Sequence, residues 1–134
     1  MTDTPETKHA TLRWLDALRF EGGEPGGPQV LIDADNATAP GPMVQLLLAA
    51  ASCAGADVVS ILKKMQVGLE SLEVRMEGRR RAEHPKRYTA IHYAWAIKGT
   101  GLDVAKARRA IDLSMEKYCS VIHSLAPDIA TSHD

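Results

Sequence analysis

The sequence is poor in aromatic side chains and has no excess of charge of either sign. Phe, Trp and Tyr make up 4% of the 134 residues. A single chain with so few bulky residues would have a thin core, which favours burial across a subunit interface. The 16 Lys and Arg residues oppose 17 Asp and Glu residues, for a formal net charge of -1. This balance gives no global electrostatic reason to bind nucleic acid or an anionic membrane.

The sequence also predicts neither a targeting segment nor a membrane-spanning segment. The N-terminus has no basic region followed by an apolar one, as a secretory signal would. The longest uncharged stretch, residues 37–56, is interrupted by Pro40, Gly41 and Pro42. Its continuous apolar part is shorter than the ~20 residues of a membrane-spanning helix. We therefore expect a cytoplasmic protein.

No phosphate-binding or zinc-protease motif occurs, and no cofactor is indicated. What is present, 45% hydrophobic and 25% charged residues, is typical of a globular protein. We expect one domain over residues 1–134, with a flexible tail over residues 1–9.

The first third of the chain predicts short strands. Apolar residues at even positions, Leu12 to Phe20, indicate a strand or a short hairpin within residues 10–20. Residues 21–28 are rich in Gly and Pro and predict a loop. Residues 29–33 (QVLID) read as the next strand, and residues 35–42 as a second loop.

A long helix is predicted over residues 43–66, where Leu and Ala, strong helix formers, predominate. Pro42 suits its first turn, and Gly55 is a possible interruption. Because the segment is apolar on every side up to Ala56, we expect a buried central helix. Beyond Asp57 one face becomes apolar: Val58, Ile61, Leu62 and Met65.

The second half predicts two antiparallel strands and further helices. Residues 69–77 and 89–97 alternate between apolar and polar, and a basic turn joins them. A helix capped by Asp103 follows, then a helical segment towards Pro127 and a possible short final strand. The predicted inward residues are Leu72, Val74 and Met76, then Ile91, Tyr93, Trp95 and Ile97, then Val104, Ala107, Ile111 and Met115. This order favours an α+β fold with an antiparallel sheet.

Two cysteines, Cys53 and Cys119, are the main candidates for chemistry. In a reducing compartment each is either an inert core residue or a reactive thiol. Small neighbours leave room at Cys53 for a substrate or a second sulfur. Cys119 ends one helical segment or begins another, and a thiol at a helix N-terminus would have a lowered pKa.

Two other groups of residues have both a structural and a functional interpretation. His123 follows Cys119 by four residues and could share a metal with Cys53 or His92, although two ligands do not make a site. The basic run could bind phosphate or could be a solvated hairpin end. That run consists of Arg79, Arg80, Arg81, Lys86 and Arg87.

The stretch GPMVQLLLAAASCAGADVVSILKKM and the later AIDLSMEKYCSVIHSL resemble the OsmC/Ohr family of thiol-dependent hydroperoxide reductases. Within the family, the early LRWLDALRF…QVLIDAD pattern, the VVSIL continuation and the EKYCSV block are most similar to the YhfA-like branch. The resemblance runs from about Leu12 to the C-terminus. It includes two cysteines 66 residues apart, each in its expected context.

The resemblance implies an OsmC-like α+β fold and an intertwined homodimer. Long buried central helices would be wrapped by antiparallel sheets, with active sites at the subunit interface. In the family's peroxidases the first cysteine, matching Cys53, attacks an organic hydroperoxide and becomes a sulfenic acid. The second, matching Cys119, closes a disulfide that a dithiol reductant opens. Neither a metal nor an organic cofactor is implied.

One position departs from the family pattern. The peroxidases have a Pro-Glu pair eleven and ten residues before the first cysteine, and here Pro42 is followed by Met43. The missing Glu would orient an Arg that stabilises the thiolate. Arg13 and Arg19 lie in the corresponding N-terminal region but not in the family's motif. The resemblance therefore implies a peroxidase weakened by Met43, or alternatively a non-catalytic dimer that binds a small apolar ligand or senses redox state at its interface pocket.

Overall fold

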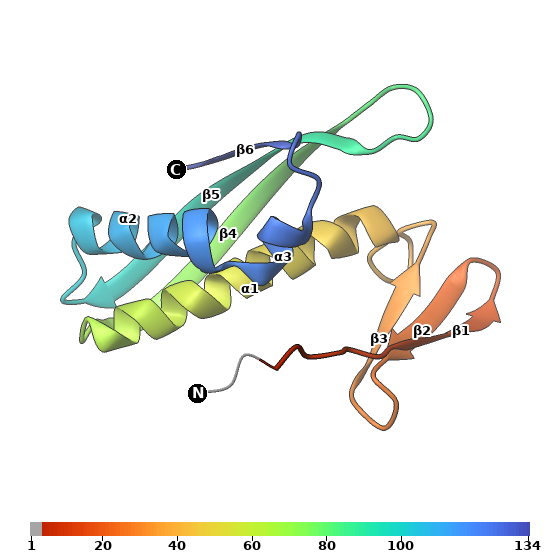
Figure 1. Ribbon diagram of the computed structural model, residues 1–134, viewed down its shortest axis with the longest axis horizontal. Helices are drawn as coiled ribbons and strands as arrows, with labels where there is room; N and C mark the ends of the chain where they lie inside the picture. Colours follow the sequence, from red (N-terminus) through yellow and green to blue (C-terminus); the bar gives the residue numbers. More distant parts are fainter. Residues whose placement is uncertain (1–3) are drawn as a thin grey trace. The chain divides into compact units, whose positions relative to one another are not determined.

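The computed structural model describes residues 4–134 and has the predicted α+β class (Figure 1). Two compact units, residues 1–46 and 47–134, make up the chain. The single domain over residues 1–134 stays a prediction. Its tail begins outside the described residues, and residues 4–10 are exposed and form neither helix nor strand. The elements are β1 (Thr11–Asp16), β2 (Arg19–Gly23), β3 (Gln29–Asp33), α1 (Pro42–Lys64), β4 (Gly68–Arg80), β5 (Tyr88–Thr100), α2 (Val104–Leu113), the π-helix η1 (Ser114–Tyr118), α3 (Ser120–Ser124) and β6 (Ala130–His133).

An antiparallel sheet in the order β1–β2–β3 forms most of the N-terminal unit. The pattern over residues 10–20 is a hairpin, one of the two predicted alternatives. The predicted loop over residues 21–28 is wrong at its start, because β2 continues to Gly23. A Cβ on Gly22 would lie 3.1 Å from Leu12 Cδ1. Glycine here therefore permits the close approach of β1 and is not a turn signal.

One face of this sheet carries most of its apolar side chains. The register pairs Trp14 with Phe20 and Phe20 with Ile32, so the three share a face, together with Leu12 and Val30. Trp14 is 65% exposed, and Leu12 and Val30 are also exposed. We call these five residues the N-terminal apolar face. Three short strands need such a face covered to be stable.

The loop between β3 and α1 is held by carboxylate and amide side chains. The carboxylate of Asp33, a buried residue, accepts hydrogen bonds from the backbone N–H of Asp35 (2.9 Å) and of Thr38 (2.9 Å) and from the Thr38 hydroxyl (2.8 Å). Asn36 Oδ1 accepts from the N–H of Gly41 at 2.9 Å. The bonds to Asp33 lower the pKa of its carboxyl below the ordinary value. This network orients the chain as it enters α1.

Helix α1 begins at Pro42, as predicted, and Gly55 does not interrupt it. Its expected burial on every side is wrong for the single chain, because one face is open: Leu48 is 43% and Val59 42% exposed. The opposite face is buried within the C-terminal unit. That face comprises Ala50, Ala51, Ala54, Gly55, Val58 and Leu62.

The second sheet has the order β4–β5–β6. The predicted alternation in β4 and β5 is confirmed, with Ile91 and Tyr93 almost completely buried. The final strand β6 also exists, but it pairs in parallel with β5, so the expectation of a wholly antiparallel sheet is wrong. The chain returns to β5 through a helical crossover, which allows a parallel pair. Figure 1 shows α1 and α2 on one side of the β4–β5 pair.

The helical crossover between β5 and β6 begins at a side-chain cap and consists of three consecutive helical segments. The Asp103 carboxylate caps α2 by accepting from the N–H of Lys106 at 2.8 Å, as predicted. Ile111 and Met115 of the predicted apolar stripe are buried, but Val104 is 74% exposed. A π-helix, η1, follows α2 directly, and Cys119 separates it from α3.

By length and hydropathy alone α1 could cross a membrane. The argument that this stretch is too short for a span is therefore wrong. A core helix passes the same test. Several of the helix's residues are fully buried inside the C-terminal unit, among them Ala50, Ala54 and Val58.

Asp33→Ala should lower the stability of the whole chain, because the substitution removes the acceptor of three hydrogen bonds. A lowered carboxyl pKa in the folded state means that this contribution is present above pH 3.8 and is lost as the pH falls below that value. Urea denaturation of both proteins as a function of pH measures it. Asp35→Ala, at an exposed carboxylate, is the control. Equal losses in the two variants would contradict the assignment.

Candidate functional site

The two cysteines are brought together in the C-terminal unit. Cys53 lies in the middle of α1 and is half-buried, whereas Cys119 is completely buried at the junction of η1 and α3. Cys53 lies near enough to Cys119 to raise the pKa of its thiol, and both thiols are free. The fold thus brings together two cysteines that are 66 positions apart in the sequence. The structure therefore contains two reduced thiols close to each other.

Cys119 is both the end of η1 and the N-cap of α3, which confirms the prediction that it lies at a helix boundary. Its backbone is extended (φ -69°, ψ 105°). The sulfur accepts the N–H of Ile122 at 3.5 Å, and the thiol donates to the Ala50 carbonyl at 3.7 Å. These contacts connect the second cysteine to α1 next to the first.

The environment of Cys119 favours the protonated thiol. Burial, together with the neighbouring Cys53, raises its pKa to about 11, while the backbone N–H groups of Ile122 and Val121 act in the opposite direction. The idea that a helix N-terminus lowers this pKa is therefore wrong here, because loss of solvation outweighs the weak backbone contacts that the five-residue helix α3 provides. Near neutral pH, Cys119 is a thiol and not a thiolate.

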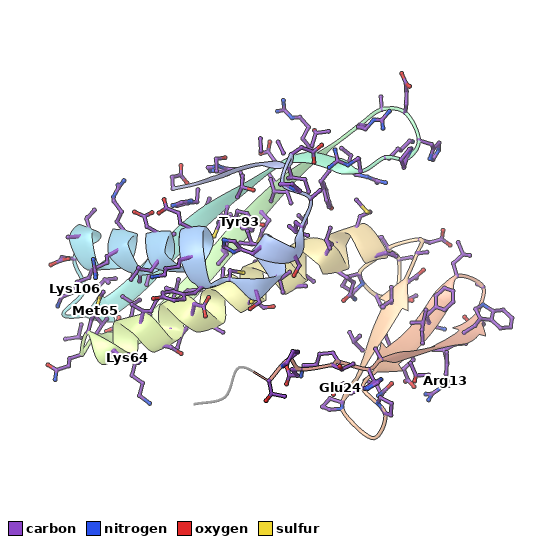
Figure 2. All side chains as sticks on the ribbon, in the orientation of Figure 1. Arg13, Glu24, Lys64, Met65, Tyr93 and Lys106 are labelled. Carbon is purple, nitrogen blue, oxygen red and sulfur yellow. The ribbon has the colours of Figure 1, made fainter. Side chains whose placement is uncertain are left out.

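Tyr93 forms part of the buried surroundings of Cys119 and was predicted only as a core residue. It lies between the β4–β5 strands and the helices, as Figure 2 shows. Its hydroxyl has no hydrogen-bond partner among the residues that the structure describes. Burial, followed by the electrostatic effect of Cys119, raises the pKa of its phenol to about 12. The alternation of apolar and polar residues in β5 predicted that Tyr93 points inward. No local sequence pattern indicated that the Cys119 thiol would be its neighbour.

Ser114 and Asp57 are two further polar residues near the thiols that sequence reasoning missed. The Ser114 side chain is completely buried and donates to Asp57 Oδ2 at 2.8 Å. The two residues are 57 positions apart in the sequence. Neither belongs to a recognisable motif, so only the folded chain reveals the pair.

The arginines considered as thiolate partners both have acidic partners in the N-terminal unit. Arg13 binds Glu21, and Arg19 binds Asp16 at 3.2 Å. Both lie in the β1–β2 hairpin; Figure 2 labels Arg13. Met43, in the first turn of α1, provides no carboxylate at the position where the resemblance expects one.

The structure does not assemble the metal site considered from the sequence. No group of three potential ligands occurs within residues 4–134. The ring nitrogens of His123 lie 2.8 and 3.1 Å from the carbonyl oxygens of Cys119 and Glu116. His92 contacts Ser132 and Asp134 beside β6. Both histidines are thus occupied by contacts that do not involve a sulfur.

The basic turn between β4 and β5 is partly neutralised by local contacts. Arg87 pairs with Asp128 at 2.7 Å, and Arg80 donates to the Lys86 carbonyl at 2.7 Å. Of the two interpretations, these contacts favour a solvated hairpin end over a phosphate site.

Comparison with known proteins identifies the family of this fold. The model for OsmC-like proteins matches residues 34–134, a range that contains both cysteines. The chain belongs to the OsmC-like family. Protein YhfA of Escherichia coli strain K12 is 38% identical over 125 residues, which cover 92% of this chain and 93% of YhfA.

Similar solved structures agree with this membership. A hypothetical protein from Aquifex aeolicus VF5 has a TM-score of 0.82 and 28% identity, over 97% of this chain and 96% of that chain. An organic hydroperoxide resistance protein OsmC from Legionella pneumophila has a TM-score of 0.68 and 14% identity, over 98% and 97%. At that identity the second likeness shows the OsmC-like fold and leaves activity open.

The two thiols should differ sharply in their reactivity towards iodoacetamide. Near neutral pH we expect Cys53 to be alkylated at least about tenfold faster than Cys119, because Cys119 is inaccessible and its thiol stays protonated. Mass spectrometry of peptides from the native protein measures both rates. In denaturant, the control condition, the rates should become similar. Preferential labelling of Cys119 in the native protein would contradict the assignment.

Proposed function

We propose that this protein is a thiol-dependent redox protein that reduces organic hydroperoxides through Cys53 and Cys119. The observation that carries the proposal is the proximity of a half-buried thiol to a fully buried one. A reversible thiol–disulfide cycle needs such a pair, with one sulfur open to the substrate and the other protected from it.

Cys53 is the sulfur that meets the peroxide. Its thiolate attacks the distal oxygen of the hydroperoxide, the O–O bond breaks, and the leaving alkoxide takes up a proton as the alcohol. Sulfur is oxidised and the peroxide is reduced, so Cys53 becomes a sulfenic acid. Small residues on both sides of Cys53, Ser52 and Ala54, leave space for an approaching substrate.

Cys119 then closes the disulfide. Its sulfur displaces the hydroxyl from the sulfenic sulfur, and the hydroxyl leaves as water with the thiol proton of Cys119. Because that thiol is protonated and buried, it does not compete for peroxide. The unequal burial of the two thiols therefore sets the order of the two steps.

A dithiol of external origin completes the cycle by thiol–disulfide exchange, which restores both cysteines and oxidises the dithiol. No cofactor takes part in the proposed reaction. A reducing compartment suits a disulfide that must be opened after every turnover, so the proposal includes a cytoplasmic location.

Met43 bears on the rate of the first step. An apolar side chain there cannot orient a guanidinium over Cys53 as a carboxylate would, and Arg13 and Arg19 bind acidic partners in their own hairpin. We expect the attack on peroxide to be slower than in an enzyme with a Glu at this position.

The proposal also includes a homodimer. The N-terminal apolar face and the open face of α1, with Leu48 and Val59, are both exposed in the single chain. Each unit thus has apolar surface that its own residues leave uncovered. A second copy offers the same two surfaces and could bury both.

Treatment of the reduced protein with one equivalent of an organic hydroperoxide should convert two free thiols into one Cys53–Cys119 disulfide. Cys53→Ser should abolish the reaction, because the attacking sulfur is gone. Cys119→Ser should accumulate a sulfenic acid at Cys53, because nothing resolves it. Thiol titration and mass spectrometry after trapping with dimedone measure these products.

Hydrogen peroxide and an aliphatic hydroperoxide provide the comparison of substrates, and the disulfide should turn over when a dithiol is added. Thiols that stay reduced at stoichiometric hydroperoxide would overturn the peroxidase proposal. Stabilisation of the fold by an apolar compound, unchanged in Cys53→Ser, would instead favour a non-catalytic ligand-binding dimer.

In sedimentation experiments we expect the wild-type chain to be a dimer and Leu48→Asp or Trp14→Glu to dissociate it at least about tenfold more readily. A charge buried in an apolar interface is strongly unfavourable. Val104→Asp is the matched control, because Val104 is an exposed apolar residue outside both faces. A monomeric wild-type protein would contradict the homodimer.

A further inference from the structure

The segment that carries Cys119 is attached to α1 at two points. One is Cys119 itself, whose thiol contacts the Ala50 carbonyl. The other is Ser114, five residues earlier, whose hydroxyl lies 3.2 Å from the Ala54 carbonyl and 2.8 Å from Asp57 Oδ2. The backbone of η1 joins the two points, because the Cys119 N–H donates to the Ser114 carbonyl at 2.8 Å.

The residues of α1 at and between these two points of attachment lie on one face of the helix. Ala50, Cys53, Ala54 and Asp57 follow the spacing i, i+3, i+4, i+7. Ala50 and Ala54 are completely buried, and their small side chains allow the facing segment to reach the backbone carbonyls of α1. Cys53 therefore lies between the two points at which the Cys119 segment is attached.

The Ser114 contact is stronger than an ordinary side-chain bond. A hydroxyl has one proton to donate, and a carboxylate is the better acceptor of the two within reach. Ser114 is completely buried, so without Asp57 its hydroxyl would keep only the longer bond to the Ala54 carbonyl. The pair thus holds η1 at a defined position along α1.

We propose that Ser114 and Asp57 are positioning residues that hold Cys119 against Cys53 and so favour closure of their disulfide. This inference rests on the proposed function for its biological meaning. Cys119 lies in extended backbone beyond η1 with its thiol on the Ala50 carbonyl of α1, while Ser114 keeps the preceding segment in place. Without that attachment, disulfide formation would itself have to order the segment and would lose effective concentration.

The test measures the effective concentration of the two thiols in glutathione redox buffers, with reduced and disulfide forms separated by mass spectrometry. No peroxide is needed. Ser114→Ala should lower the effective concentration about tenfold, which corresponds to about 1.4 kcal/mol. Asp57→Ala should lower it less, because the Ser114 hydroxyl can still donate to the Ala54 carbonyl. Asp57→Asn should stay close to wild type, because its amide oxygen can still accept from Ser114.

The double variant Ser114→Ala/Asp57→Ala should be no worse than Ser114→Ala alone, since Ser114→Ala already removes the bond to Asp57. Ser124→Ala is the matched control: its hydroxyl bonds only within its own segment, to the Ser120 carbonyl at 2.8 Å. It should retain the wild-type value. Circular dichroism confirms folding, and Asp57→Ala, at a half-buried position, serves if Ser114→Ala does not fold.

An unchanged effective concentration in a folded Ser114→Ala protein would overturn the inference and leave the proposed function standing. Conversely, a wild-type protein that forms the disulfide in glutathione buffer but ignores hydroperoxide would overturn the proposed function and leave the positioning role intact. A loss in Asp57→Asn as large as in Asp57→Ala would also count against the inference.

Discussion

The close contact between α1 and the segment from Ser114 to Cys119 is the constraint on which the candidate site depends. Buried alanines at positions 50 and 54 let the second segment reach the backbone of the helix. A larger side chain at either position would push the segment, and Cys119 with it, away from Cys53. The chemistry is therefore made possible by residues that have no chemistry of their own.

Different burial gives two identical functional groups different roles. Cys53 is partly open, whereas Cys119 is enclosed by Tyr93, α1 and its own segment, and desolvation raises its pKa to about 11. A protonated thiol is a poor nucleophile towards peroxide, but it brings the proton that the departing hydroxyl of a sulfenic acid needs. In the proposed reaction, the absence of solvent at Cys119 thus accounts both for its low reactivity towards peroxide and for its role in the second step.

Features with a local cause could be predicted from the sequence. The cap at Asp103, the start of α1 at Pro42 and the alternation around Ile91 all follow from neighbours a few residues away. The parallel pairing of β6 could not be predicted, because it depends on where the crossover returns the chain. The cysteine pair came from family resemblance. No sequence pattern predicted the Ser114–Asp57 hydrogen bond, which joins residues 57 positions apart.

The departure at Met43 and the intact thiol pair are consistent with each other when the two steps are considered separately. A charged partner for the thiolate affects only how fast Cys53 attacks a peroxide. Closure of the disulfide depends instead on distance, on the proton of Cys119 and on the attachment of its segment through Ser114. A chain can therefore lose the first kind of assistance and still preserve the second. Such a protein would respond slowly to peroxide but would retain a disulfide that forms readily once Cys53 has been oxidised by any route.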